Sequence, residues 1–183
     1  MILRKFRLLL VSCLIGLWTI SSQAAEWTMA SGYPKSNFHT QNIIKFIDDV
    51  KSGSSVKINL NPNDTLIKLD AIKTSLQRGQ IPIGEIRFGL YGNEDPMYIL
   101  AGLPFIAPDY ASAWLLKEVK HAYLQEKFNK KGLRILYTSP WPGQGFYTKF
   151  PVNKVSDFNG KKLRIYSTAT QQMGSMLGFN ATI

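Results

Sequence analysis

The sequence predicts an α/β fold with a largely parallel sheet. Short apolar or alternating segments of strand length are separated by longer segments whose apolar residues recur at helical spacing. No internal repeat and no low-complexity segment interrupts this order. Such an alternation is typical of parallel strands that are connected by helices.

Several segments have the character of strands. The clearest is residues 56–60, where Val56, Ile58 and Leu60 alternate with polar residues. Pro82 favours a strand beginning or a sheet edge for its segment. The predicted strands are residues 26–30, 56–60, 81–88, 133–137 and the segment around Arg164, and residues 180–183 resemble the opening of a further strand.

The segments between the strands predict helices. Ser36 or Asn37 can cap the first helix, and Gly79 is a good stop for the second. The predicted helices are residues 37–50, 65–78, 97–103, 111–129 and 168–177. In the long helix 111–129 we expect an inward face made of Trp114, Leu115, Val119, Ala122, Tyr123 and Phe128.

The first 24 residues have the pattern of a secretion signal. Arg4, Lys5 and Arg7 precede a continuous apolar run, and small residues end the segment at Ala24. A retained membrane anchor is the alternative, which the short length of the run disfavours. We therefore expect export from the cytoplasm.

Charge and cysteine content exclude several classes of protein. The chain carries 22 Lys and Arg against 12 Asp and Glu, but the positive charge is spread out and forms no basic–aromatic run for nucleic acid. The single cysteine, Cys13, lies within the predicted signal. The sequence therefore predicts no disulfide framework, no thiol catalysis and no cysteine-ligated metal.

No catalytic or cofactor motif is present. The sequence has no nucleophile elbow, phosphate loop or dinucleotide fingerprint. His39 and His121 have no partner at metal-ligand spacing, so we expect each to be satisfied or solvated. These observations predict a protein that is not an enzyme and that binds neither metal nor cofactor.

What remains is a set of recognition residues in the loops that follow the strands. Ligands of open α/β sheets bind beyond the carboxyl ends of strands, in pockets with mostly apolar walls. Tyr33, Trp141 and Tyr147 lie in such loops. We expect these three aromatic residues to line a binding cleft.

Arg87 and Arg164 are candidates for binding a carboxylate. Each is flanked by two apolar residues in a predicted strand, and a guanidinium offers a planar fork that matches a carboxylate. For Arg164 the alternative is a surface side chain that follows Lys161 and Lys162. Glu85 and Arg87 share one strand face, so they either pair with each other or one of them touches ligand.

Four segments together resemble a known family. They are Trp27 to Gly32, Arg78 to Ile81, Leu103-Pro104-Phe105, and Val155 to Arg164. The last looks like the family's "Asp-Leu-Lys-Gly-Lys-Lys-Ile-Arg" signature. Along nearly all of the chain after residue 24, the order of these features resembles solute-binding proteins of the tripartite ATP-independent periplasmic (TRAP) transporters.

The resemblance implies a two-lobed clamshell of the periplasmic binding protein type, with a mostly parallel sheet in lobe one. It implies a signal at residues 1–24, lobe one at 25–150 and an incomplete start of lobe two at 151–183, so that we expect the chain to be part of a longer protein. The clamshell would capture an organic acid and deliver it to TRAP membrane permease subunits. Arg164 occupies the signature arginine that usually pairs with the solute carboxylate, and Gln144 stands near a second polar position of the family.

The predicted function is thus a periplasmic binding component of a TRAP transporter for a carboxylate solute. The predicted ligand-binding residues are Arg164, Gln144, Arg87, Tyr147, Trp141, Glu85 and Tyr33, with a hinge near Phe150 to Val152. An ABC-type binding protein and a secreted α/β enzyme are the alternatives. Neither the identity of the solute nor the oligomeric state follows from the sequence.

Overall fold

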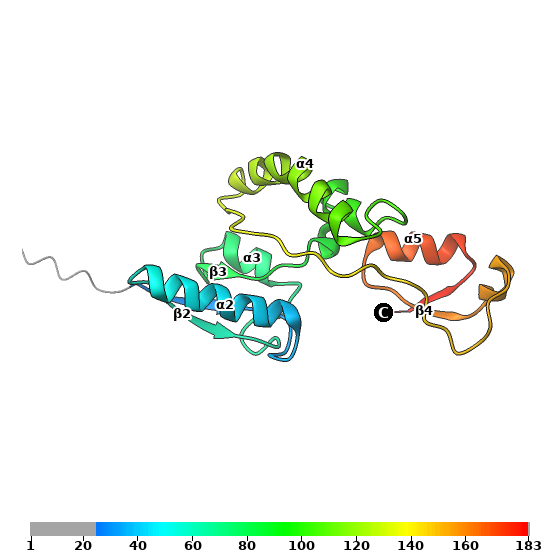
Figure 1. The fold of residues 1–183 in the computed structure, drawn as a ribbon, viewed down its shortest axis with the longest axis horizontal. Coiled ribbons are helices and arrows are strands. Elements are labelled where there is room, and N and C mark those ends of the chain that lie inside the picture. Colours follow the sequence, from blue (N-terminus) through cyan, green and yellow to red (C-terminus); the bar gives the residue numbers. More distant parts are fainter. Residues whose placement is uncertain (1–24, 183) are drawn as a thin grey trace, which may run out of the picture.

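A computed structural model describes residues 25–182 of the chain (Figure 1). Its first sheet has the order β2-β1-β3, and both pairs of strands are parallel. β1 (Glu26–Ala30) lies in the centre, between β2 (Lys57–Asn61) and β3 (Ile83–Gly84). Because all three strands run the same way, their carboxyl ends meet at one edge of the sheet.

Helices cover both faces of this sheet. Consecutive residues of a strand point to opposite faces, so Met29 and Ala30 belong to different cores. Met29 packs with Ile43 of α2 (Phe38–Gly53), and Ala30 packs with Ile72 of α3 (Ile72–Gln77). The predicted α/β fold with a parallel sheet is confirmed.

A third core lies beyond β3. Three short 3₁₀ turns, η1 (Phe88–Tyr91), η2 (Pro96–Tyr98) and η3 (Leu100–Gly102), lead to the long helix α4 (Tyr110–Asn129). Tyr91 and Tyr98 pack there against Leu124 and Phe128 of α4. Lys73 of α3, only 3% exposed, bonds to Glu94 and lies 4.2 Å from the centre of the Tyr91 ring, which ties α3 to this core.

The remaining elements form a second, smaller unit. β4 (Lys162–Arg164) pairs in parallel with β5 (Asn180–Thr182), and α5 (Thr168–Met176) connects them. The 3₁₀ turn η4 (Val155–Phe158) precedes β4 in this unit. Its core contains the stacked, buried rings of Phe158 and Phe179, and the exposed Phe146 ring packs against both. In Figure 1 the unit lies at the opposite end of the molecule from β2 and α2.

Three sequence expectations are wrong in detail. Residues 133–137 form no strand; Leu133 and Ile135 pack against the α4 core, but within residues 25–182 no neighbouring strand pairs with this segment. The segment 81–88 is a strand only at Ile83–Gly84. The helix predicted from residue 65 begins at Ile72, because Asp64, at φ 58°, accepts a hydrogen bond from the Leu69 amide and holds a turn there.

The buried face predicted for α4 is also wrong. Trp114 is 59% exposed and Val119 is 72% exposed, and Leu115 is exposed as well. The buried residues of α4 are Lys120, Leu124 and Phe128. Of the predicted inward side chains, only Phe128 is therefore buried within the described part of the chain.

Candidate functional site at the lobe junction

The candidate site begins where β1 and β3 end. Ala30 is paired with Gly84, and the Glu85 amide donates a 2.9 Å hydrogen bond to the Ala30 carbonyl. The two loops that follow therefore start side by side. This register brings Ser31 and Tyr33, from the first loop, to Glu85 and Arg87, from the second.

Glu85 is a half-buried carboxylate that one neighbour orients. The buried Ser31 hydroxyl donates a 2.5 Å hydrogen bond to Glu85 Oε2. Burial raises the pKa of Glu85, and the Ser31 hydrogen bond opposes this rise. Among residues 25–182, no cation lies within ion-pair distance of Glu85.

Arg87 reaches the second unit. Its guanidinium donates a 3.2 Å hydrogen bond to the Tyr166 carbonyl, which directly precedes α5. Its Nε atom is buried and has no partner within the described residues. The pairing of Glu85 with Arg87, one of the two expectations from the sequence, is not formed. Arg87 is thus a half-buried cation that no carboxylate of residues 25–182 neutralises.

An aromatic cluster borders these groups. Trp141 packs edge-on against Tyr33 and His39, with ring centres 5.3 and 4.4 Å apart, and Phe38 completes the cluster. The Tyr33 hydroxyl and His39 Nε2 are buried without a hydrogen-bond partner in the described chain. Burial raises the pKa of Tyr33, and the nearby Arg87 charge opposes it. Burial lowers the pKa of His39, which favours the neutral form of its imidazole.

The first turn of α5 forms the opposite side of the junction. Ser167 caps this helix by accepting a hydrogen bond from the Thr170 amide. The Thr168 hydroxyl is buried without a partner in residues 25–182. It lies against the loop of the first unit, since a Cβ atom on Gly92 would stand 2.7 Å from Thr168 Oγ1.

These observations place four polar groups without partners in one region. They are the Tyr33 hydroxyl, His39 Nε2, Arg87 Nε and the Thr168 hydroxyl, and they are the buried side-chain polar atoms of the described chain that lack a partner. Buried polar groups are nearly always hydrogen-bonded in native proteins, and each exception needs a physical reason. A polar ligand at the junction would supply the missing partners.

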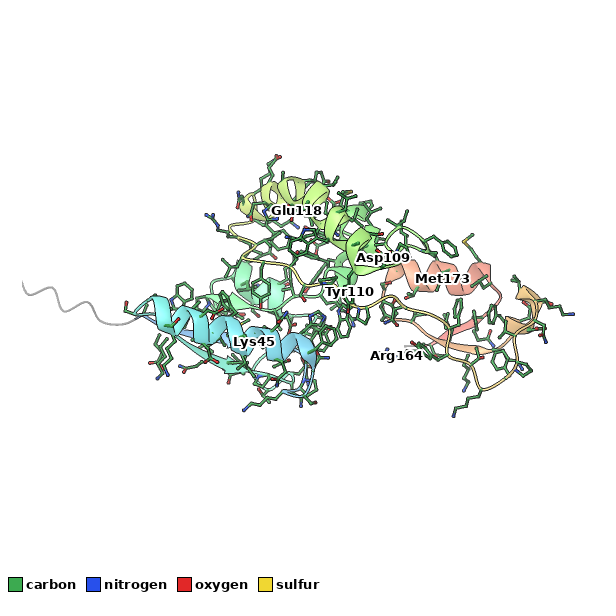
Figure 2. All side chains as sticks on the ribbon, in the orientation of Figure 1. Lys45, Asp109, Tyr110, Glu118, Arg164 and Met173 are labelled. Carbon is green, nitrogen blue, oxygen red and sulfur yellow. The ribbon has the colours of Figure 1, made fainter. Side chains whose placement is uncertain are left out.

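The other predicted site residues lie apart from these four groups. Arg164 is exposed and ends β4 on the side of the second unit that is turned toward the first (Figure 2). Gln144 is exposed, and Tyr147 is 91% exposed. The structure therefore groups Tyr33, Glu85, Arg87 and Trp141 and leaves Arg164, Gln144 and Tyr147 outside this group.

Sequence reasoning missed two residues of the junction. His39 was expected to be satisfied or solvated, but it is 6% exposed and its Nε2 has no partner among residues 25–182. Its burial depends on Trp141, which lies far away in the sequence. Thr168 follows a recognisable helix cap, and that cap was the available signal for it. His121 is exposed, as expected.

A hollow of about 380 Å³ lies between α2 and α4 and shares Phe38 with the aromatic cluster. Phe38, Tyr110, Trp114 and Tyr137 form its apolar walls. None of the four unpartnered groups lines it. Within residues 25–182, no cluster of three His, Cys, Asp or Glu residues has the geometry to hold a metal, and no helix has the length and apolarity to cross a membrane.

Comparison with known proteins defines the family. Residues 29–183 match the DctP family, described as bacterial extracellular solute-binding protein, family 7. DctP6 of Bordetella pertussis, an extracytoplasmic solute receptor binding pyroglutamic acid, is 36% identical, with a TM-score of 0.83 over 86% of this chain and 53% of its own. A marine metagenome TRAP solute-binding protein specific for pyroglutamate is 35% identical, with a TM-score of 0.82 over 87% of this chain and 53% of its own.

A more distant structure supports the fold alone. The TRAP periplasmic solute-binding protein of Desulfovibrio salexigens is 19% identical, with a TM-score of 0.74 over 86% of this chain and 52% of its own. No curated protein matches the sequence. The chain spans about half the length of the solved structures that it matches.

The chain therefore belongs to the DctP family of bacterial extracellular solute-binding proteins. The resemblance to TRAP solute-binding proteins that the sequence indicated is confirmed. The family consists of solute receptors for transport rather than of enzymes, and it is extracytoplasmic.

Proposed function

We propose that the protein captures an organic acid between its two units and delivers it to the membrane permease of a TRAP transporter. Arg87 carries this proposal. It is a half-buried guanidinium at the junction, it has an unpartnered N–H, and no acid of residues 25–182 neutralises it. A buried cation is costly unless a charge of opposite sign pairs with it, so a solute carboxylate is the fitting occupant.

The second carboxylate contact is assigned to Arg164. In the described structure it ends β4 on the side that is turned toward the first unit (Figure 2). Rotation of the second unit about residues 150–152 would carry Arg164 toward Arg87, as in hinge closure of two-lobed binders. Gln144 and Tyr147, which are exposed and precede this hinge, would line the cleft from the side of lobe one. Lobe one is then residues 25–150, and residues 151–183 begin lobe two.

Location and partners follow from the same proposal. Residues 1–24 act as a signal for export, and the receptor works in the periplasm. The two relatives named above bind pyroglutamate, a small cyclic carboxylic acid, which supports a small organic acid as the solute here. The permease recognises the closed, loaded form.

The test is a pair of charge removals in the full-length protein. We expect Arg87→Ala and Arg164→Ala each to weaken binding of the preferred acid at least tenfold, because a hydrogen bond to a charged group contributes about 1.5–3 kcal/mol. Titration calorimetry against a panel of organic acids, sugars and amino acids measures this. Arg134→Ala, an exposed arginine outside the junction, is the matched control and is expected to bind normally.

Two results would contradict the proposal. Binding of sugars or cationic amino acids in place of acids would exclude organic acids as the class of solute. An unchanged affinity in Arg87→Ala would show that Arg87 does not bind the solute, and the proposal depends on that contact.

A further inference from the structure

Glu85 lies at the junction in an environment that does not neutralise it. Oε2 accepts the hydrogen bond from Ser31, and no other side chain of residues 25–182 donates to the carboxylate. Arg87 lies two residues further along the chain, but it forms no ion pair with Glu85, and its guanidinium donates to the Tyr166 carbonyl instead. Oε1 therefore remains an acceptor that no side chain of the described structure satisfies.

The surroundings of Glu85 add no cation. Tyr33 and Tyr137 are close enough for the Glu85 charge to raise the pKa of each hydroxyl, although burial is the larger cause in both. Neither phenol carries a positive charge. The junction thus presents an unneutralised cation, Arg87, and an unneutralised anion, Glu85, on the same strand end.

One kind of solute satisfies both groups. Its carboxylate pairs with Arg87, and an N–H or O–H group close to that carboxylate donates to Glu85. An ionised carboxylate only accepts hydrogen bonds, so a methylene group in place of the donor leaves Glu85 desolvated and without a partner. A second carboxylate in place of the donor would be repelled.

We infer that Glu85, held by Ser31, selects acids that carry a hydrogen-bond donor beside the carboxylate, such as 2-hydroxy acids and 2-amido or lactam acids, over plain carboxylates. This inference rests on the proposed function, because it concerns the same site. Pyroglutamate, the ligand of the two relatives, has a ring N–H on the carbon that bears its carboxylate. Sites built to hydrogen-bond a substrate group reject analogues that lack it far more strongly than apolar pockets reject a missing methylene.

The experiment compares matched acids on the full-length protein by titration calorimetry. The pairs are L-pyroglutamate with 3-oxocyclopentanecarboxylate, in which a methylene replaces the ring N–H alone, and 2-hydroxybutyrate with butyrate. We expect the wild-type protein to bind the donor-bearing member of at least one pair more than tenfold more tightly. In Glu85→Gln we expect this ratio to fall below threefold, since Ser31 donates to the amide oxygen and the amide N–H₂ then faces the solute donor.

Two further variants complete the experiment, one as a second test of Glu85 and one as a control. Ser31→Ala keeps the Glu85 charge but removes the hydrogen bond that orients the carboxylate. We expect this variant to reduce the affinity ratio of the matched acids in part. Glu118→Gln, an exposed glutamate of α4, is the matched control and is expected to keep the full ratio. Thermal melting confirms that each variant is folded, and if Glu85→Gln does not fold, Ser31→Ala decides.

The outcomes separate this inference from the proposed function. Failure of every acid to bind the wild-type protein would overturn both. Binding of both members of each pair within threefold would overturn the role of Glu85 and leave the carboxylate receptor standing. A tenfold preference that survives in Glu85→Gln, or in Ser31→Ala where that variant decides, would also overturn the role of Glu85.

Discussion

At the scale of single residues, the junction holds two charged side chains that the described chain does not neutralise. Glu85 is desolvated and carries no neutralising partner within the described chain, and the same is true of Arg87. Such groups destabilise a folded protein in the absence of ligand, and they persist where function requires them. The free energy of unfolding that the unpaired Glu85 charge costs should therefore be measurable, by removing this charge without changing the shape of the side chain.

Glu85→Gln is expected to raise the thermal stability of the unliganded protein at pH 7. Burial raises the folded-state pKa of Glu85 above its ordinary value of 4.5, so the ionised form is disfavoured by folding and stability falls as pH rises through this window. A gain of about 1 kcal/mol would raise the melting temperature by roughly 2–4 °C.

The pH dependence is the control for this prediction. Well below pH 4.5, Glu85 is protonated in both the folded and unfolded states, and the gain over wild type is expected to disappear. Melting curves at pH 7 and pH 3.5 measure both values. A variant that is less stable than wild type at pH 7 would show that Glu85 is neutralised in the folded protein.

At the scale of elements, the loops after parallel strands were predictable and the packing of helices was not. Glu85, Arg87 and Tyr33 could be grouped from the sequence, because β1 and β3 are parallel neighbours whose carboxyl ends must meet. The strand predicted at 133–137 is absent, because a strand needs a pairing partner that the local sequence does not reveal.

The prediction of the buried face of α4 failed for a related reason. The apolar residues of α4 surround the helix, so they do not define a single buried face.

The contact between Gly92 and α5 gives a prediction at this scale. A Cβ atom at residue 92 would lie 2.5 Å from Ile99 Cγ2 and 2.7 Å from Thr168 Oγ1, so Gly92→Ala must displace the loop or the first turn of α5. We expect weaker solute binding and a lower melting temperature, because overpacking of this kind reduces the free energy of unfolding by about 1–3 kcal/mol.

Gly102→Ala is the matched control, since a Cβ atom there would meet no atom within 4 Å. Calorimetry measures the solute affinity of both variants, and thermal melting measures their stability. Equal behaviour of the two alanine variants would show that the junction has room for the methyl group.

At the scale of the whole molecule, the described chain leaves much apolar surface uncovered. Phe105 is 94% exposed, and the α4 side chains Trp114, Leu115 and Val119 are also exposed. Large apolar side chains exposed in this number promote association unless something covers them. The matched solved structures have about twice the length of this chain.

We therefore expect the polypeptide 25–183, produced alone, to aggregate or to bind a hydrophobic dye strongly. Size-exclusion chromatography and dye fluorescence measure this directly. Changing Trp114, Leu115 and Val119 together to polar residues is expected to reduce the aggregation. A sharp, reversible melt of the unmodified polypeptide as a monomer would show that these side chains need no cover.

The hydrogen bond from Arg87 to the Tyr166 carbonyl also has a kinetic consequence. It joins the two units, and a solute carboxylate that pairs with this guanidinium must displace the Tyr166 carbonyl. Release of Arg87 from the Tyr166 carbonyl is then a step whose rate does not depend on solute concentration, so the observed binding rate in a stopped-flow experiment is expected to level off as solute concentration rises. The plateau would report the rate of this release, and at high solute concentration the receptor rather than the supply of solute would limit uptake.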